Sequence, residues 1–417
     1  MSFQQGLSGL NAASTGLDVA GNNIANAETV GFKSARPEFA DVFANSLIGA
    51  STNSVGIGTQ VAAVATQLTQ GNVAVTNNPF DLAINGNGFF RMSQNGTISY
   101  TRNGQFGLDK NGFVVDNGGR RLTGFAADAT GNIVPSAPVD IQLSTSDIAA
   151  SETTKSAVVA NFDARSTPPA TAVFNPLDST SFNSSTAYTV YDSLGDPHVM
   201  SVYFVKTAAP GQWTLHATVD GTAETRTTLS ANNIQFDAFG TLTAPVGPIN
   251  VSVDLNQIGI DLGKVNSANS PLNFTLDFTG STQFGSPFGV NAITQDGFSS
   301  GRLTGVSIGA DGTVLGNYSN GQTRNLAQVV LATFVNGQGL KPLGHNQYAE
   351  TPDSGAPLVG APSTGSLGVL QSAAVEQSNV DLTAELINLI TLQRDYQANA
   401  QTIKTQDAVL QTLVNLP

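Results

Sequence analysis

The sequence predicts a mostly β protein with a long α-helix at each end, arranged as nested domains. Two observations carry this prediction. Apolar residues recur with the heptad period of a coiled coil near both ends of the chain, and the residues between them form short apolar runs divided by Asn-Gly turns. With 417 residues, the chain exceeds what one simple core accommodates, so two or more domains are expected.

The first helix is expected over roughly residues 3–27. Its seam positions advance by alternating steps of four and three residues, as in a coiled coil. Four glycines weaken the helix by about 1 kcal/mol each relative to alanine, so it needs a partner surface. The seam consists of Phe3, Leu7, Leu10, Ser14, Leu17, Gly21 and Ile24.

The second helix is expected from about Val380 to Asn415, with a capping-box-like start at Ser378 and Asp381. Its seam follows the same steps and is more apolar. Two such ends in one chain pair with each other, with copies from other subunits, or with both. The seam consists of Leu382, Leu386, Leu389, Gln393, Tyr396, Ala400, Ile403, Asp407, Leu410 and Val414.

The intervening residues read as β strands in three blocks. One block, from Ile84 to Phe125, contains five Asn-Gly dipeptides, each of which indicates a hairpin. A second block, from Val306 to Phe334, also consists of short apolar runs divided by Asp-Gly and Asn-Gly turns. Between them, "AYTVYDSLGDPHVMSVYFV" predicts two strands around a Gly-Asp turn, and alternating leucine and phenylalanine at 272–278 adds another.

The simplest organisation of these blocks is nested, with the third block inserted into the other two. The terminal helical domain comprises residues 1–27 and 376–417, and connecting segments comprise 28–70 and 361–375. The inner β domain comprises 71–146 and 291–360, and the outer inserted β domain comprises 147–290.

Composition excludes several classes of protein. A net charge of −13 argues against nucleic-acid binding, and the absence of cysteine excludes disulfides and thiolate chemistry. No apolar run reaches the length of a membrane span, so membrane insertion is not expected. The first residues lack the basic and apolar regions of a secretory signal, so no cleaved signal peptide is expected.

No catalytic constellation emerges from the chemistry-bearing residues. The three histidines, His198, His216 and His345, have no metal-ligand spacing. Asp192 and Asp196 flank a predicted turn, where aspartate is common without any catalytic role. We therefore expect no catalytic, cofactor-binding or metal site, and no enzyme activity.

Three stretches resemble the bacterial flagellar axial proteins of the rod and hook. They are "LSGLNAASTGLDVAGNNIANAETVGFKS" (residues 7–34), the inner β stretch beginning "FDLAINGNGFFRM", and "SNVDLTAELINLITLQRDYQANAQTIKTQDAVLQTLVNL" (378–416). The resemblance fades across 147–290. The length of the chain and the inserted block favour a hook-type member over the shorter rod-type members.

The resemblance implies a structural subunit that assembles into a curved, flexible tube. Such a tube acts as a universal joint between motor and filament. The implied partners are many copies of the chain itself, the distal rod, the hook cap, the hook–filament junction proteins and the flagellar type III export apparatus. The implied location is the hook of the flagellar basal body, outside the cell after export.

The residues expected at assembly contacts combine the two seams with the Asn/Gly-rich segment after the first helix. The resemblance implies that this segment turns the chain from the helix towards the β domains. The expected contact residues are Leu7, Leu10, Leu17, Ile24, Asn22, Asn23, Asn26, Gly31, Phe32, Leu382, Leu386, Leu389, Tyr396, Ile403, Leu410 and Val414.

Three alternative functions differ from a hook subunit. A distal rod-type axial protein shares the same ends. A secreted β-rich adhesin has similar low-charge strands but does not account for heptads at both ends. A carbohydrate-active enzyme would use the Asp-rich turns as its site.

Overall fold

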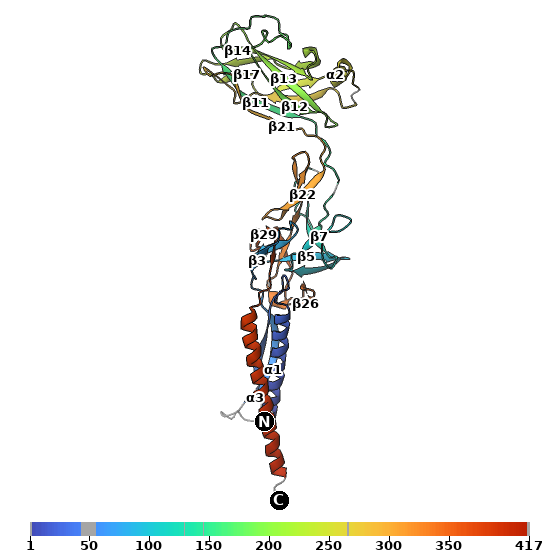
Figure 1. Cartoon of the computed structure of the whole chain (residues 1–417), viewed down its shortest axis with the longest axis vertical. Helices are drawn as coiled ribbons and strands as arrows, with labels where there is room; N and C mark the ends of the chain where they lie inside the picture. Colours follow the sequence, from blue (N-terminus) through green and yellow to red (C-terminus); the bar gives the residue numbers. More distant parts are fainter. Residues whose placement is uncertain (1, 43–55, 129, 145, 265–266, 415–417) are drawn as a thin grey trace. The chain divides into compact units, whose positions relative to one another are not determined.

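The computed structural model describes residues 2–42, 56–128, 130–144, 146–264 and 267–414 (Figure 1). The described chain is mostly β strand with a long helix near each end, as the sequence predicts. It divides into two compact units. Unit 1 comprises Met1–Ser144, Gly305–Gly316 and Thr323–Pro417, and unit 2 comprises Thr145–Thr304 and Asn317–Gln322. Unit 2 is thus inserted into unit 1, which is the nested arrangement that the sequence predicts.

Helices α1 (Ser2–Ala25) and α3 (Leu382–Val414) begin and end within two residues of their predicted limits. The start of α3 is capped by Asp381, whose carboxylate accepts the backbone N–H groups of Thr383 and Ala384. Ser378 instead accepts the N–H of Val380 before the helix begins. The cap therefore comes from one of the two residues that the sequence suggested.

A two-stranded hairpin runs beside α1, within the segment predicted only as a connection. It consists of β1 (Ala35–Val42) and β2 (Gly58–Thr66), which pair antiparallel. Side chains of α1 hold it: Gln5 donates to the carbonyl of Gly56, and Ser8 accepts the N–H of Thr59. Residues 43–55 of the predicted connection lie outside the described residues.

The remaining strands that lie wholly or mostly in unit 1 form one large sheet and two short strand pairs. In the large sheet β22, β23, β24, β9, β5, β6, β27 and β26 follow one another, and further strands branch from them. The strands are β3 (Val73–Val75), β4 (Leu82–Asn85), β5 (Phe89–Gln94), β6 (Thr97–Thr101), β7 (Phe106–Leu108), β8 (Val114–Asp116), β9 (Arg121–Ala126), β10 (Val139–Asp140), β22 (Leu303–Ile308), β23 (Thr313–Tyr318), β24 (Thr323–Val329), β25 (Leu331–Thr333), β26 (Lys341–Gly344), β27 (Gln347–Ala349), β28 (Leu358–Gly360), β29 (Val369–Ser372) and β30 (Ala374–Glu376), with a 3₁₀ turn at Gly337–Gly339.

Two of the predicted Asn-Gly turns are built around an aspartate rather than around the asparagine. Only at Asn95-Gly96 do both residues of a predicted dipeptide have positive φ, giving a two-residue turn between β5 and β6. At Asn111-Gly112 the turn starts at Asp109, whose carboxylate accepts the N–H groups of Asn111 and Phe113. Asp116 and Asp237 make the same two bonds to residues two and four positions on.

Unit 2 is a sandwich of two sheets with a shared apolar core. One sheet has the order β15-β18-β19-β11-β20, with β21 also paired to β11, and the other has the order β12-β13-β14-β16-β17. The elements are β11 (Lys155–Asp163), β12 (Ser184–Tyr191), β13 (Pro197–Lys206), β14 (Gln212–Val219), a 3₁₀ turn (Glu224–Arg226), β15 (Thr227–Leu229), β16 (Asn233–Phe236), β17 (Leu242–Ala244), β18 (Ile249–Val253), α2 (Leu255–Asp261), β19 (Leu272–Asp277), β20 (Thr282–Phe284) and β21 (Gly289–Gln295).

The predicted strands of the inserted block lie in this sandwich. The expected turn joins β12 to β13, and Leu272, Phe274, Leu276 and Phe278 are all buried. The boundary differs from the predicted one, because residues 291–304 belong to unit 2. β21 pairs there with β11, and bridges join Ser151 to Phe298 and Ile148 to Gly301. The separation of the terminal helices from the inner β domain as a domain of their own stays a prediction.

Candidate assembly interface

The two terminal helices lie side by side and antiparallel (Figure 1), with matching residues spaced seven apart on each. Gly9 faces Asn399, Gly16 faces Leu392, and Asn23 donates its amide to the carboxylate of Glu385 at 2.8 Å. A Cβ placed on Gly16 would lie 2.8 Å from Leu392 Cδ2. Glycine therefore lets the backbone of α1 approach α3 closely.

The face of α1 that contacts α3 is a stripe of small residues, not the predicted seam. Its period is the predicted heptad, but Gly9, Gly16 and Asn23 each precede a predicted seam position by one residue. Three of the four glycines counted as weakening the helix, Gly6, Gly9 and Gly16, are residues that fit α1 against α3. Contacts of the predicted seam with other subunits stay a prediction. The buried residues of α1 are Gly6, Ala12, Ala13, Gly16, Ala20 and Asn23.

Substitutions at two glycines of α1 should have different effects on stability. Leucine at Gly16 would overlap Leu392, and overpacking costs typically 1–3 kcal/mol. Leucine at Gly21, which has nothing within 4 Å, should be neutral or should stabilise by up to about 1 kcal/mol through helix propensity. We expect denaturant titration followed by far-ultraviolet circular dichroism to rank Gly21→Leu above Gly16→Leu. Equal destabilisation by both would contradict the close approach at Gly16.

Five of the ten seam residues that are expected at assembly contacts and have described side chains are exposed in this chain. Leu7 is 44% exposed and Leu386 is 49% exposed. Leu382, Tyr396 and Leu410 are also exposed, whereas Leu10, Leu17, Ile24, Leu389 and Ile403 are half-buried. Of the predicted α3 seam, Ile403 contacts α1, beside Gly6. Val414 ends α3, but its side chain lies outside the described residues.

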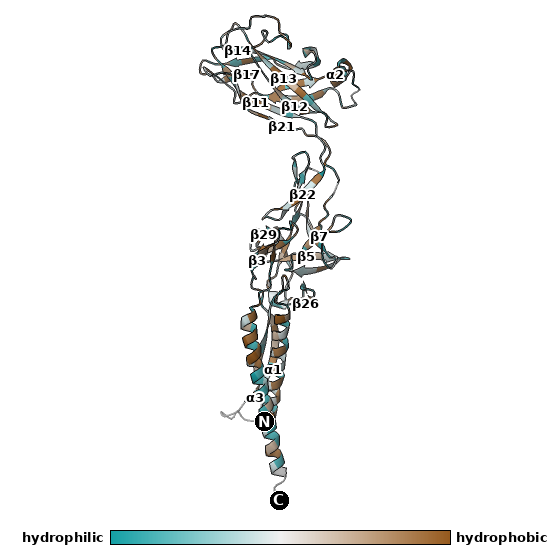
Figure 2. Ribbon diagram, viewed as in Figure 1, coloured by the Kyte–Doolittle hydropathy of each residue, from teal (hydrophilic) through white to brown (hydrophobic). Residues whose placement is uncertain are grey.

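The first turns of α3 are hydrophobic (Figure 2), and four of the exposed apolar residues of this helix lie there. Leu382, Leu386 and Ile390 are four residues apart and therefore share one face of the helix, and Ile387 adjoins them. We call these four residues the α3 patch. Because α1 packs against another side of α3, through Glu385 and Leu392, the patch is not covered by that helix.

The Asn/Gly-rich segment at the end of α1 and just after it ties the helix pair to the β strands of unit 1. Asn23 is buried, and its amide both donates to the carbonyl and accepts from the N–H of Ala35, at the start of β1. Asn26 bonds back to the carbonyl of Asn22 and closes the end of α1. Asn22 is exposed and Phe32 is half-buried. Of the three predicted asparagines, Asn23 thus joins α1, β1 and α3.

Gly31 occupies a position that a larger residue cannot take. Its φ is +71°, and a Cβ would lie 2.5 Å from the backbone nitrogen of Asn103. Its own N–H donates to the carbonyl of Glu376 at 2.8 Å. The segment after α1 is thereby held between the turn that follows β6 and the end of β30.

A buried group of three charges lies next to Gly31. Glu376 accepts from Lys33 Nζ at 2.5 Å and from Arg102 Nη1 at 3.0 Å, and its side chain is fully buried. Lys33 also donates to the carbonyl of Thr69, and the N–H of Gly71 donates to Glu376. Burial lowers the pKa of Lys33 from its ordinary value, and the contact with Glu376 opposes this lowering. We call Lys33, Arg102 and Glu376 the charge triad.

Sequence reasoning missed five residues at this junction. Besides the charge triad these are Glu385, which binds Asn23, and Asn379, whose amide bonds the backbone of Ser34, Gln67 and Thr69. A weak signal existed: Lys33 and Glu376 each follow apolar residues in segments with few other charges. Nothing in the sequence pairs them with each other.

No helix among the described residues is long and apolar enough to cross a membrane. The same residues contain no group of three or more His, Asp or Glu that could hold a metal ion.

Models of flagellar protein families match the chain in four places. "Flagella basal body rod protein" matches residues 3–33, and "Flagellar hook protein FlgE/F/G D1 domain" matches 83–160. "Flagellar basal body protein FlaE D2 domain" matches 161–298, and "Flagellar basal body rod FlgEFG protein C-terminal" matches 371–416. The matches include both helices and most of unit 2.

Curated relatives are similar over the whole length. The flagellar hook protein FlgE of Escherichia coli (strain K12) is 42% identical over 422 residues, covering 100% of both chains. The FlgE of Borreliella burgdorferi is 34% identical over 441 residues, covering 100% of this chain and 99% of its own. A crystal structure of Helicobacter pylori flagellar hook protein FlgE2 gives a TM-score of 0.51 at 14% identity, covering 73% of this chain and 100% of that one, a likeness of fold.

Proposed function

Because the chain belongs to the flagellar hook protein family and is a structural subunit of the flagellar hook, we propose that it assembles with copies of itself into a tube through its terminal helices. The observation that carries this proposal is the α3 patch. Leucine and isoleucine there remain open to water although α1 and α3 already pair within the chain. Exposed apolar clusters of this kind are typical of protein contacts.

Low charge supports a polymer built from this chain. Charged residues are 11% of the sequence, and the ion pairs Arg36–Glu38 and Arg302–Asp147 are long and well exposed. Exposed pairs contribute little to stability. Contacts between copies would therefore rest mainly on apolar and neutral polar residues, which allow small shifts between neighbours in a bending tube.

The proposal extends to partners and location. The flagellar hook is the location that the family gives. By resemblance, we propose that the tube joins the distal rod at one end, bears the hook cap during growth, and meets the junction proteins at the filament side. We further propose that subunits reach the growing end through the flagellar type III export apparatus without cleavage of a signal.

Polymerisation of the purified chain tests the proposal. We expect concentrated protein to form tubes of helical symmetry in electron micrographs, and to sediment, above a threshold concentration. A chain that stays monomeric at every concentration, with its helices formed by circular dichroism, would contradict self-assembly through the helices.

A further inference from the structure

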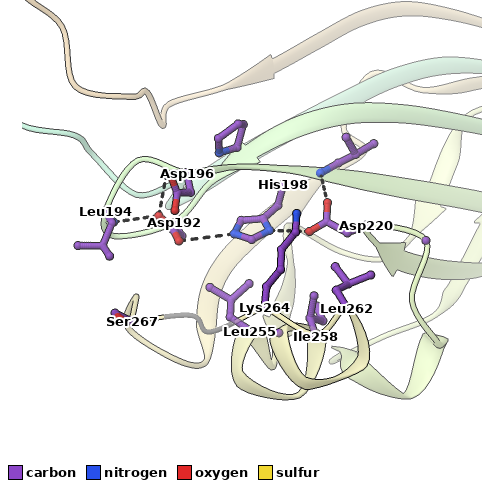
Figure 3. A pocket seen from close by; sticks show the side chains of 14 residues that line it. Asp192, Leu194, Asp196, His198, Asp220, Leu255, Ile258, Leu262, Lys264 and Ser267 are labelled. Carbon is purple, nitrogen blue, oxygen red and sulfur yellow. Dashed lines mark hydrogen bonds and ion pairs between the residues drawn. The ribbon is translucent and has the colours of Figure 1, made fainter.

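His198 of unit 2 lies between two carboxylates (Figure 3). Its Nδ1 is 2.7 Å from Asp220 Oδ2, and its Nε2 is 3.5 Å from Asp192 Oδ2. Asp192 begins the turn between β12 and β13, whereas Asp220 follows β14. One imidazole ring thus connects two turns that are separated in the sequence.

Asp192 is held in place and removed from water. Its residue is 0% exposed, and its Oδ1 accepts the N–H groups of Leu194 and Asp196 at 2.9 Å. Its Oδ2 and the Nε2 of His198 are both buried, and neither has a hydrogen-bond partner at ordinary length. A buried carboxylate oxygen is costly unless a positive charge or a donor compensates it.

The proton count of the ring follows from these contacts. A neutral imidazole carries one N–H, so whichever nitrogen holds it, the other presents a lone pair to a carboxylate. An imidazolium carries N–H on both nitrogens and places a positive charge between the two carboxylates. The charged form is therefore the one that satisfies both contacts.

We propose that His198 is a protonated clamp: it carries a proton on each ring nitrogen, bridges Asp192 and Asp220, and makes unit 2 less stable as pH rises. The clamp lies at the wall of an open pocket of about 960 Å³. Leu255, Ile258 and Leu262, in and just after α2, also line this pocket. The pocket gives solvent a route to the neighbourhood of the clamp, so that its protons can exchange.

The other charged groups at the pocket are Asp196, in the same turn as Asp192, and Lys264, after α2. The hydrogen bond to Asp220 raises the pKa of His198 above its ordinary value, against an opposing effect of burial, and Asp192 adds to the rise. A raised pKa in the folded chain means that the clamp stabilises fully below about 6.5, the unfolded value, and that this contribution is lost as pH rises through the folded value.

The protonation state can be measured directly. The full chain has three histidines, so selective ¹⁵N labelling gives few ring signals, which single His→Gln variants assign. Near neutral pH we expect both ring nitrogens of His198 to show the similar shifts of an imidazolium. The two widely separated shifts of a neutral ring for His198 would overturn the proposal.

The effect on stability has its own reporter. Trp213 is the one tryptophan of the sequence and is buried in the core of unit 2, so its fluorescence follows that unit within the full chain. We expect the thermal midpoint to fall between about pH 6 and about pH 9. In Asp192→Asn the amide can donate to a neutral ring, so the fall should be smaller. His216→Gln, which alters a histidine paired with Glu224 instead, should keep the part of the fall that Asp192→Asn removes.

Two outcomes of this second experiment would contradict the clamp. One is a midpoint in the unaltered chain that does not fall over this pH range. The other is a fall that Asp192→Asn leaves unchanged and His216→Gln abolishes, which would assign the pH dependence to the other histidine.

Discussion

Leu386→Asp is expected to raise the concentration needed for polymerisation about a thousandfold while leaving the monomer intact. Burying a leucine contributes about 1.5–3 kcal/mol. An aspartate at an apolar contact loses this and adds the cost of placing a charge there. A combined loss of roughly 4 kcal/mol corresponds to about three orders of magnitude in an equilibrium constant. Sedimentation across a concentration series measures the threshold.

The monomer should tolerate the change because Leu386 is 49% exposed within the chain. Its calorimetric melt should match that of the unaltered protein. Thr402→Asp is the matched control: it adds the same charge to an exposed position of α3, about four turns from the α3 patch, where the hydroxyl donates to the carbonyl of Ala398. Polymerisation of Leu386→Asp at the ordinary threshold would show that the α3 patch is not an assembly contact.

Glu376→Gln is expected to destabilise unit 1 by about 3–5 kcal/mol, the usual cost of removing one partner from a buried ion pair. The amide keeps the size of the side chain but leaves Lys33 and Arg102 buried without a counter-charge. It would also weaken the bonds from Lys33 and Gly71 that hold the segments beside the helices. Denaturant titration followed by helical circular dichroism measures the loss.

Asp140→Asn provides the control for this variant. It neutralises a carboxylate in the same unit whose partner, Arg121, lies at the same 3.0 Å but is 41% exposed at its side chain. Exposed pairs contribute about 0–1 kcal/mol, so this loss should be small. If the two variants were equally stable, the charge triad would not be what holds the helices to the strands.

Local patterns predicted the elements of the fold well. The heptad period located α1 and α3, and the Gly-Asp turn located β12 and β13, because both patterns depend on residues only a few positions apart. The phase of the α1 contact was missed for a physical reason. A seam is found by its large apolar residues, whereas α1 meets α3 through glycine and alanine, which score weakly for hydrophobicity and permit close approach.

Distant partners could not be predicted in the same way. Glu376 lies 343 residues from Lys33 and 274 from Arg102, and no spacing rule connects residues so far apart. The pairing of Asn23 with Glu385 could not be predicted for the same reason, although Asn23 itself is among the predicted contact residues. The exposure of the α3 patch likewise depends on which side of α3 is taken by α1, which only the folded chain shows.

The pairing of α1 with α3 also bears on the order in which parts of the chain fold. Asn23 and Glu385 are 362 residues apart, so their contact closes almost the whole chain into a loop. Hairpins such as β5–β6 and β12–β13 join neighbouring segments and close much sooner, since contacts of low sequence separation cost less entropy to form. The pairing of α1 with α3 is therefore expected to form late in folding, because α1 has no partner until α3 has been synthesised.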